Sequence, residues 1–209
     1  MASKSEIPIT RQRVSPAKVN VIRQAVRSAD SMASDNELVR LARPDDTEIL
    51  YNFFNDPSVY AAIYTLPHPL TLDSVRAFIV QHLAEKEQGV GLLFLNFDAD
   101  GTLGGYTDVC IWPQWAAGEL GGAVHPERQG KGAGVEGARR GFDWMFETLK
   151  LDLICETASL QNERTAKLLD RLGFCRKGEV TSYRDDGTTR QSLVWETNKK
   201  DWRRRHSAY

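Results

Sequence analysis

The chain has 209 residues and a mass of 23.5 kDa, and it is 41% hydrophobic and 26% charged, which suits one folded domain with a hydrophobic core. No run of about eighteen apolar residues occurs, and the N-terminus lacks the apolar stretch of a secretory signal, so we expect neither a membrane span nor export. Cys110, Cys155 and Cys175 lie far apart without a nearby histidine pair, which excludes a disulfide framework and a zinc knuckle. We therefore expect a cytoplasmic globular protein that binds no metal.

Charge is unevenly distributed along the chain. Residues 1–34 and 199–209 each carry +4, which leaves −9 on residues 35–198 within a net charge of −1. Basic ends could contact nucleic acid or the ribosome, but no aromatic residue is interleaved with the N-terminal charges, which favours solvated termini. We divide the chain into a polar basic arm (1–36) that contains one possible short helix, a single domain (37–198) and a basic tail (199–209).

Hydrophobic spacing predicts the elements of the domain in chain order. After a strand at 37–42, Asp45 and Asp46 can cap a helix that reaches Phe54. The further elements are helices at 72–87, 132–149 and 162–172, and strands at 90–97, 103–112, 119–124, 151–157, 174–183 and 188–197. This order of strands and helices predicts an α/β domain, α+β in some schemes.

A glycine-rich segment precedes the helix at 132–149. Glycines at 130, 132 and 134 let backbone N–H groups approach a ligand closely, and the helix start adds the positive end of its dipole. The segment therefore predicts a phosphate site. A Rossmann site requires its glycine directly after the strand, and a P-loop requires glycine where His125 stands, so both of these nucleotide sites are excluded.

Three segments, in this order, resemble the Gcn5-related N-acetyltransferases (GNAT). Glu119-Leu-Gly-Gly-Ala-Val-His-Pro126 is similar to the E-I-G-Y-W-L-x-P stretch of the ribosomal-protein (Rim-type) branch, and Gln129-Gly-Lys-Gly-Ala-Gly134 to the family's [QR]-x-x-G-x-[GA] acetyl-CoA motif. Residues 162–174 resemble the N-x-x-[ST]…L-G-F segment. The resemblance covers 37–198. It implies a GNAT fold, with a mixed, mostly antiparallel sheet of about seven strands, flanked by about four helices, whose fourth and fifth strands splay apart.

The resemblance also implies acetyl-CoA as the cosubstrate. Pantetheine would lie between the splayed strands and bond backbone groups of the fourth strand, while loop amides would hold the pyrophosphate. The residues implied are Gly122, Ala123 and Val124 for pantetheine and Gln129, Gly130, Lys131, Gly132, Ala133 and Gly134 for the pyrophosphate. Asn162 would contact pantetheine, or it is only a helix cap.

Direct attack by an amine on the thioester needs a base, and Glu119 is the candidate because its strand borders the expected thioester. The alternative is an exposed strand-end carboxylate; His125 is expected to be structural. Many family members place a tyrosine where this chain has Leu169. The hydroxyl of Thr165 is the candidate donor to the departing thiolate, or it merely bonds backbone in the first helical turn.

The amine acceptor stays open, and either a small molecule or a protein N-terminus fits. Trp112 and Trp115 could line its pocket or simply pack, and Tyr64, with Tyr60 and His68, borders the acceptor region that the family implies. An acyl-CoA sensor or partner-binding module of the same fold, with little turnover, is the alternative function. The oligomeric state also stays open, a homodimer included.

Overall fold

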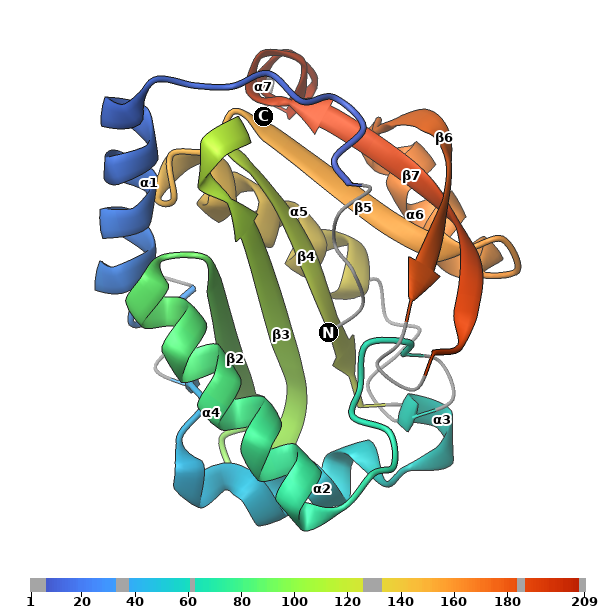
Figure 1. Ribbon diagram of the computed structural model, residues 1–209. Coiled ribbons are helices and arrows are strands. Elements are labelled where there is room, and N and C mark those ends of the chain that lie inside the picture. The colour runs from blue at the N-terminus through green and yellow to red at the C-terminus, as the bar shows by residue number, and fades with distance from the viewer. Residues whose placement is uncertain (1–6, 33–37, 61–62, 126–132, 184–186, 207–209) are drawn as a thin grey trace.

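A computed structural model describes residues 7–32, 38–60, 63–125, 133–183 and 187–206 of the chain. Seven strands form one sheet in the order β1-β2-β3-β4-β5-β7-β6 (Figure 1). Their bounds are β1 Val39–Leu41, β2 Gly91–Phe97, β3 Leu103–Trp112, β4 Ala117–Val124, β5 Leu153–Ser159, β6 Cys175–Tyr183 and β7 Thr189–Asn198. Every neighbouring pair is antiparallel except β4 and β5, which are parallel. The predicted mixed, mostly antiparallel sheet is confirmed.

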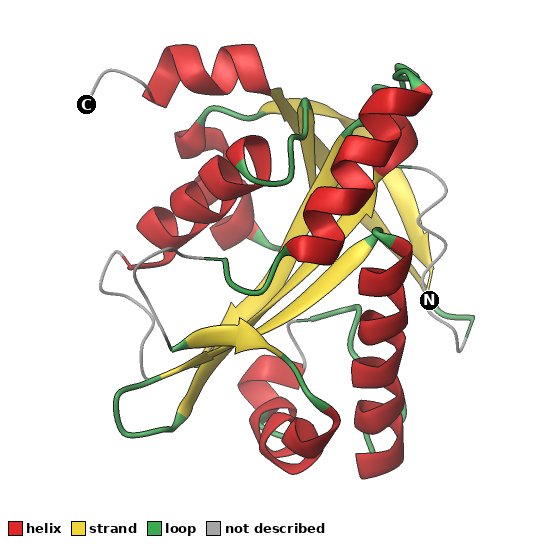
Figure 2. Ribbon diagram, turned by 90° about the vertical axis from the view of Figure 1, so that its left-hand side faces the viewer, coloured by secondary structure: helices red, strands yellow, loops and turns green. Residues whose placement is uncertain are grey.

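Helices cover both faces of this sheet (Figure 2). The α-helices are α1 Pro16–Ser28, α2 Thr47–Phe54, α3 Pro57–Tyr60, α4 Leu72–Gln88, α5 Ala133–Glu147, α6 Glu163–Leu172 and α7 Lys199–His206, and short 3₁₀ turns occupy Pro44–Asp46 and Pro113–Trp115. We call the face that carries α4 the front face and the face that carries α5 and α6 the back face. The four helices expected in the domain are present, and the described residues add α1, α3 and α7.

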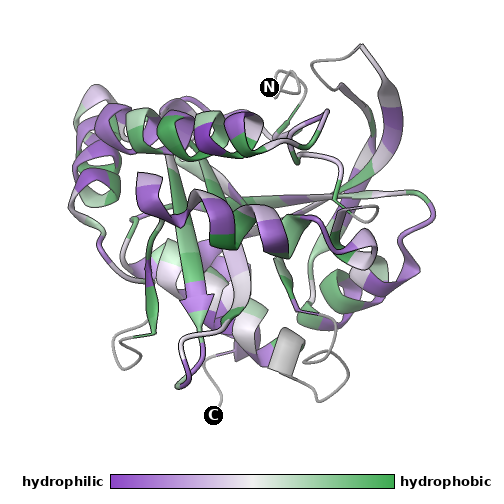
Figure 3. Cartoon of the chain, turned by 90° about the horizontal axis from the view of Figure 1, so that it is seen from below, coloured by the Kyte–Doolittle hydropathy of each residue, from purple (hydrophilic) through white to green (hydrophobic). Residues whose placement is uncertain are grey.

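Apolar side chains fill both interfaces of the sheet. Behind it, Phe142 and Met145 of α5 belong to one buried cluster with Leu92 and Phe94 of β2. In front, α2 and α4 pack on alternate residues of β2 and β3, because successive strand residues face opposite sides. Hydrophobic residues gather in the central strands, whereas the helices alternate hydrophobic and hydrophilic residues (Figure 3). No helix of the described residues is long and apolar enough to span a membrane.

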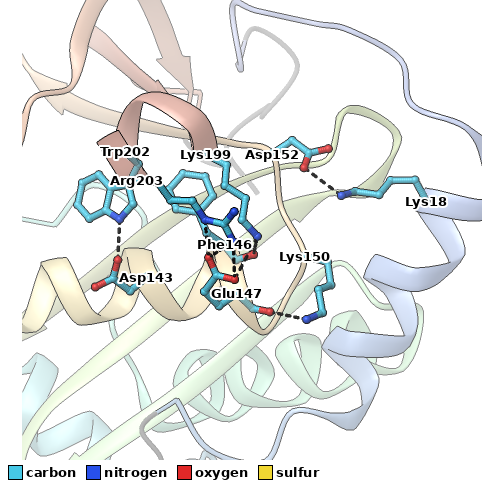
Figure 4. Close-up of polar contacts among 9 residues, drawn as sticks. All are labelled: Lys18, Asp143, Phe146, Glu147, Lys150, Asp152, Lys199, Trp202 and Arg203. Atoms are coloured by element: carbon cyan, nitrogen blue, oxygen red, sulfur yellow. Dashed lines mark hydrogen bonds and ion pairs between the residues drawn. The ribbon is translucent and has the colours of Figure 1, made fainter. Parts of the chain in front are cut away.

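The C-terminal segment was expected to be a solvated tail, and that expectation is wrong for residues 199–206, which form α7. The indole of Trp202 is buried and donates from Nε1 to Asp143 Oδ1 on α5 at 2.7 Å (Figure 4). Lys199 Nζ donates to the carbonyl of Phe146 at 2.7 Å, and Arg203 pairs with Glu147. The basic residues therefore attach the helix to α5 in addition to facing solvent.

The N-terminal arm also packs on the domain. Ile22 and Val26 of α1 are fully buried in the back-face core, so the possible short helix of the arm forms, at Pro16–Ser28. Ahead of it, the backbone N–H groups of Ile9 and Thr10 donate to Glu196 Oε1 on β7 at 2.7 and 2.9 Å. Glu196 Oε2 is buried without a hydrogen-bond partner among the described residues. A buried carboxylate thus holds the arm against the sheet.

We expect Glu196→Ala to release this arm, because the substitution removes an acceptor that two backbone amides share. Hydrogen bonds to charged groups contribute about 1.5–3 kcal/mol, so stability to denaturant should fall by about 2 kcal/mol, and trypsin should cleave faster at Arg11 and Arg13. Glu196→Gln keeps an acceptor oxygen and is the matched control, with a smaller effect. Equal cleavage of Glu196→Ala and the wild type would show that Glu196 does not hold the arm.

Candidate active site

The central feature of the site is an opening between β4 and β5. The two strands pair only at Ala117 with Leu153 and at Gly118 with Ile154. Beyond these pairs β4 continues along β3 through Val124, and β5 continues along β7 through Ser159. Because each strand keeps its outer partner while the sheet twists, the two central strands separate, as Figure 1 shows. The predicted splay is present.

The peptide groups of successive β4 residues point alternately toward the opening and toward β3. Leu120 N–H donates toward β5, to Glu156 Oε1 at 2.8 Å, whereas His125 N–H donates toward β3, to the carbonyl of Gly104. Since the direction alternates along a strand, Gly122 and Val124 share the direction of Leu120, and Ala123 faces β3. Of the three residues expected to bond pantetheine, Gly122 and Val124 therefore face the opening, and Ala123 directs its backbone groups toward β3. Leu120 also faces the opening, with its N–H bonded to Glu156.

Gly122 is required by its surroundings. Its φ is +138°, and a Cβ there would collide with the carbonyl oxygen of Tyr106 on β3. Only glycine combines this backbone conformation with so close an approach to the neighbouring strand. The glycine therefore keeps β4 tight against β3.

Glu119 lies on the front side of the opening. Its Oε1 accepts a hydrogen bond from Thr157 Oγ1 on β5 at 2.6 Å. The side chain is half-buried, and Cys110 stands opposite it on β3. Thr157 thus orients one carboxylate oxygen across the gap, which is the placement that a base acting on a nearby amine needs.

A second carboxyl group, that of Glu156, occupies the same opening and is not among the residues predicted from the sequence. The residue is 6% exposed, and burial, followed by the neighbouring Glu119 carboxylate, raises the pKa of Glu156 well above its usual range. The sequence does contain a signal, because Glu156 follows the apolar residues Leu153, Ile154 and Cys155 in the strand predicted at 151–157, and acidic side chains are rarely buried.

The start of α6 follows the open end of β5. Asn162 Oδ1 accepts from Thr165 N–H at 3.0 Å, so Asn162 caps the helix. The helix ends at Gly173, whose φ of +84° is the left-handed conformation that a terminating glycine adopts. Thr165 Oγ1 is half-buried and makes no hydrogen bond to a described residue, so capping does not engage this hydroxyl.

The predicted pyrophosphate loop lies largely outside the described residues. Gln129, Gly130, Lys131 and Gly132 are not described; Ala133 and Gly134 form the first residues of α5, which lies behind the sheet. His125, at the end of β4, places its ring 6.1 Å from that of Phe53, a packing contact that agrees with its expected structural role.

The acceptor candidates occupy two different places. Tyr64 donates from its hydroxyl to the carbonyl of Thr188 at 2.7 Å, and the guanidinium of Arg190 stacks on its ring, so Tyr64 joins the α3–α4 connection to the β6–β7 hairpin. Trp112 is buried beside Ile7, and Trp115 stacks under Arg11. The two tryptophans contact the N-terminal arm, whereas Tyr64 remains the acceptor-site candidate. Tyr60 and His68 stack on each other near it.

A buried ion pair lies on the front face between α4 and β3. His82 Nε2 is 3.2 Å from Asp108 Oδ1, and its Nδ1 contacts the carbonyl of Phe78. Burial lowers the pKa of His82, but the Asp108 carboxylate outweighs it, and the net shift is upward. The pair ties α4 to the strand beside β4. No group of three or more potential metal-ligating side chains occurs within the described part of the chain.

A mixed sheet that opens between two parallel central strands, with strand peptide groups facing the opening, is the architecture that the GNAT resemblance predicts. A family model described as "Acetyltransferase (GNAT) domain" matches residues 37–175, and the chain belongs to this family. The sequence matches no curated protein.

Solved structures with this fold include two related to the Rim-type branch. Ribosomal-protein-S5-alanine acetyltransferase from Vibrio fischeri is 23% identical, with a TM-score of 0.65 over 78% of this chain and 93% of that one. Mycobacterium smegmatis RimJ in complex with CoA-disulfide is 19% identical, with a TM-score of 0.64 over 78% and 82%. Spermidine N-acetyltransferase from Vibrio cholerae in complex with CoA and spermine is 19% identical, with a TM-score of 0.66 over 80% and 99%.

Proposed function

We propose that this protein is a cytoplasmic enzyme that transfers the acetyl group of acetyl-CoA to a primary amine. The observation that carries the proposal is the opening between β4 and β5, where the peptide groups of Gly122 and Val124 face the gap beside the carboxylate of Glu119. Pantetheine contains amides that can bond such peptide groups as an added strand would. Residues 129–134 at the start of α5 would hold the pyrophosphate.

Acetyl-CoA supplies an acetyl thioester, and the chain's own residues bind and activate the two reactants. A β4 amide that faces the opening can stabilise negative charge on the thioester oxygen. Glu119 accepts a proton from the attacking amine, directly or through one water. Holding the amine and the thioester together removes the need for a collision and contributes much of the rate. Thr165 donates a hydrogen bond to the sulfur as it departs.

For the acceptor, the named relatives indicate two kinds of amine. Their names specify an alanine of a ribosomal protein and spermidine. In this chain Tyr64, bound to the β6–β7 hairpin, would line the acceptor side. A panel of N-terminal peptides and small amines, assayed by thiol release from acetyl-CoA, tests the proposal. Thiol release that depends on the amine supports the proposal. Tight acetyl-CoA binding without thiol release for any amine would instead indicate the alternative function, an acyl-CoA sensor or partner-binding module.

We expect Thr165→Val to slow acetyl transfer by about tenfold, because valine keeps the shape and removes the hydroxyl; water can replace part of its effect. Stability should stay within about 0.5 kcal/mol, since Asn162 supplies the cap. Asn162→Ala is the contrasting variant and should cost about 1 kcal/mol of stability. Single-turnover kinetics and melting curves measure both effects. Normal chemistry in Thr165→Val would remove this hydroxyl from the mechanism.

A further inference from the structure

The carboxyl group of Glu156 stands where the two central strands begin to separate. Gly118 is the last residue of β4 that pairs with β5, and Leu120 has the next N–H group that faces β5. Glu156 accepts that N–H at 2.8 Å, so a side chain replaces the strand-to-strand hydrogen bond at the narrow end of the opening. A thioester at the tip of a pantetheine lying in the opening would reach this end.

Glu156 and Glu119 approach the opening from opposite faces of the sheet. Thr157, which bonds Glu119, shares the front face with Cys155, whose neighbours include Trp112. Glu156 points to the opposite face, because successive residues of a strand face opposite sides. Ile154 and Ala158, which share that face, pack in the back-face core with α5. Ile63 and Leu66, on either side of the acceptor candidate Tyr64 in the chain, belong to the front-face core, on the side of Glu119. The helix expected to hold the pyrophosphate is on the side of Glu156.

The surroundings of Glu156 favour its neutral form. Its electrostatic partners are Glu119 across the opening and Cys155 beside it, and β7 places Trp195 opposite. The Leu120 amide favours the ionised form, but burial and the Glu119 carboxylate outweigh it and raise the pKa of Glu156. Two adjacent carboxyl groups whose environments differ can hold one proton between them, with one acting as acid and the other as base.

We propose that Glu156 is the general acid that protonates the sulfur of CoA, which rests on the acetyl transfer proposed above. The amine nitrogen bonds to the thioester carbon, the carbon–sulfur bond breaks, and its electron pair stays on sulfur. The carboxyl proton of Glu156 passes to that sulfur, and the proton of the amine passes to Glu119. Transfer of a proton from Glu119 to Glu156 through water then restores both groups, so no external proton is consumed.

This assignment gives Glu156 and Thr165 different tasks. Thr165 can stabilise the departing sulfur only by a hydrogen bond, because its hydroxyl does not ionise in the working pH range. A carboxyl group can transfer its proton completely. The chain has Leu169 where many family members place a tyrosine, so it needs a donor from another position.

The test is Glu156→Gln, which keeps the size of the side chain and an acceptor for Leu120 N–H but cannot transfer a proton. We expect kcat to fall by about tenfold, because the Thr165 hydroxyl and water replace part of the effect, while acetyl-CoA affinity changes less than twofold. The wild-type kcat should decline at alkaline pH as Glu156 loses its proton, and this decline should be absent in Glu156→Gln. Glu179→Gln, which alters an exposed carboxylate on β6, is the control and should match the wild type.

A second measurement leaves Glu156 intact. The Glu119 carboxylate raises the pKa of Glu156. The alkaline decline in the residual activity of Glu119→Gln should therefore begin at a lower pH than the decline in the wild-type activity. A folded Glu156→Gln protein that keeps the wild-type kcat and the wild-type alkaline decline would overturn the role of Glu156 as general acid. It would leave the proposed acetyl transfer intact. A wild-type protein that transfers acetyl to no amine would overturn the proposed function together with it.

Discussion

Replacing Glu119 with glutamine should lower kcat by about two orders of magnitude at neutral pH, the lower end of the range for loss of a general base. Glutamine has the same shape, and its Oε1 can still accept the Thr157 hydroxyl that bonds Glu119 at 2.6 Å. Acetyl-CoA affinity should change little, because Glu119 lies on the front side, where we expect the amine to bind. The loss is therefore expected in chemistry and not in cofactor binding.

Single-turnover acetyl transfer across the pH range, with calorimetric acetyl-CoA binding, measures both quantities. Glu179→Gln again serves as the control for loss of one negative charge. Below the pH at which Glu156 loses its proton, the rate of Glu119→Gln should rise with pH, because a larger share of the amine is already neutral. Full activity of Glu119→Gln throughout the pH profile would exclude Glu119 as the base.

Gly132→Asp should weaken acetyl-CoA binding well over tenfold. The side chain would obstruct close approach of backbone N–H groups, and its charge would repel the pyrophosphate at a helix start that otherwise favours anions. Gly137→Asp is the matched control: it adds the same charge to α5 at a position with open space around it. Calorimetry on both folded variants measures the difference. Equal affinities would show that the pyrophosphate does not bind at residues 129–134.

Elements with local determinants could be predicted from the sequence. Helix α4 starts at a reciprocal cap between Thr71 and Ser74, and α6 lies between the Asn162 cap and Gly173. These interactions join residues only a few positions apart, so the pattern along the chain contains them. The glycine-rich segment and Glu119 were found for the same reason, since each belongs to a short motif.

Helix α7 was missed because its sequence has no apolar stripe. Lys-Lys-Asp-Trp-Arg-Arg-Arg-His offers one large apolar side chain, and the helix depends on contacts of Trp202, Lys199 and Arg203 with α5. A short helix of this kind is marginal alone and needs tertiary packing. From its basic composition alone, the segment is therefore predicted to be a solvated tail and not a packed helix.

By itself, the sequence determined the family, the sheet elements and the candidate base, because those depend on periodicity and short motifs. Only the tertiary structure decided which groups meet in the opening. Glu156 and the Leu120 amide that donates to it are 36 positions apart in the sequence, and Glu196 and the Ile9 amide are 187 positions apart. Such contacts leave no periodic trace in the sequence, and the pKa of Glu156 depends on burial and on a charge that another strand supplies.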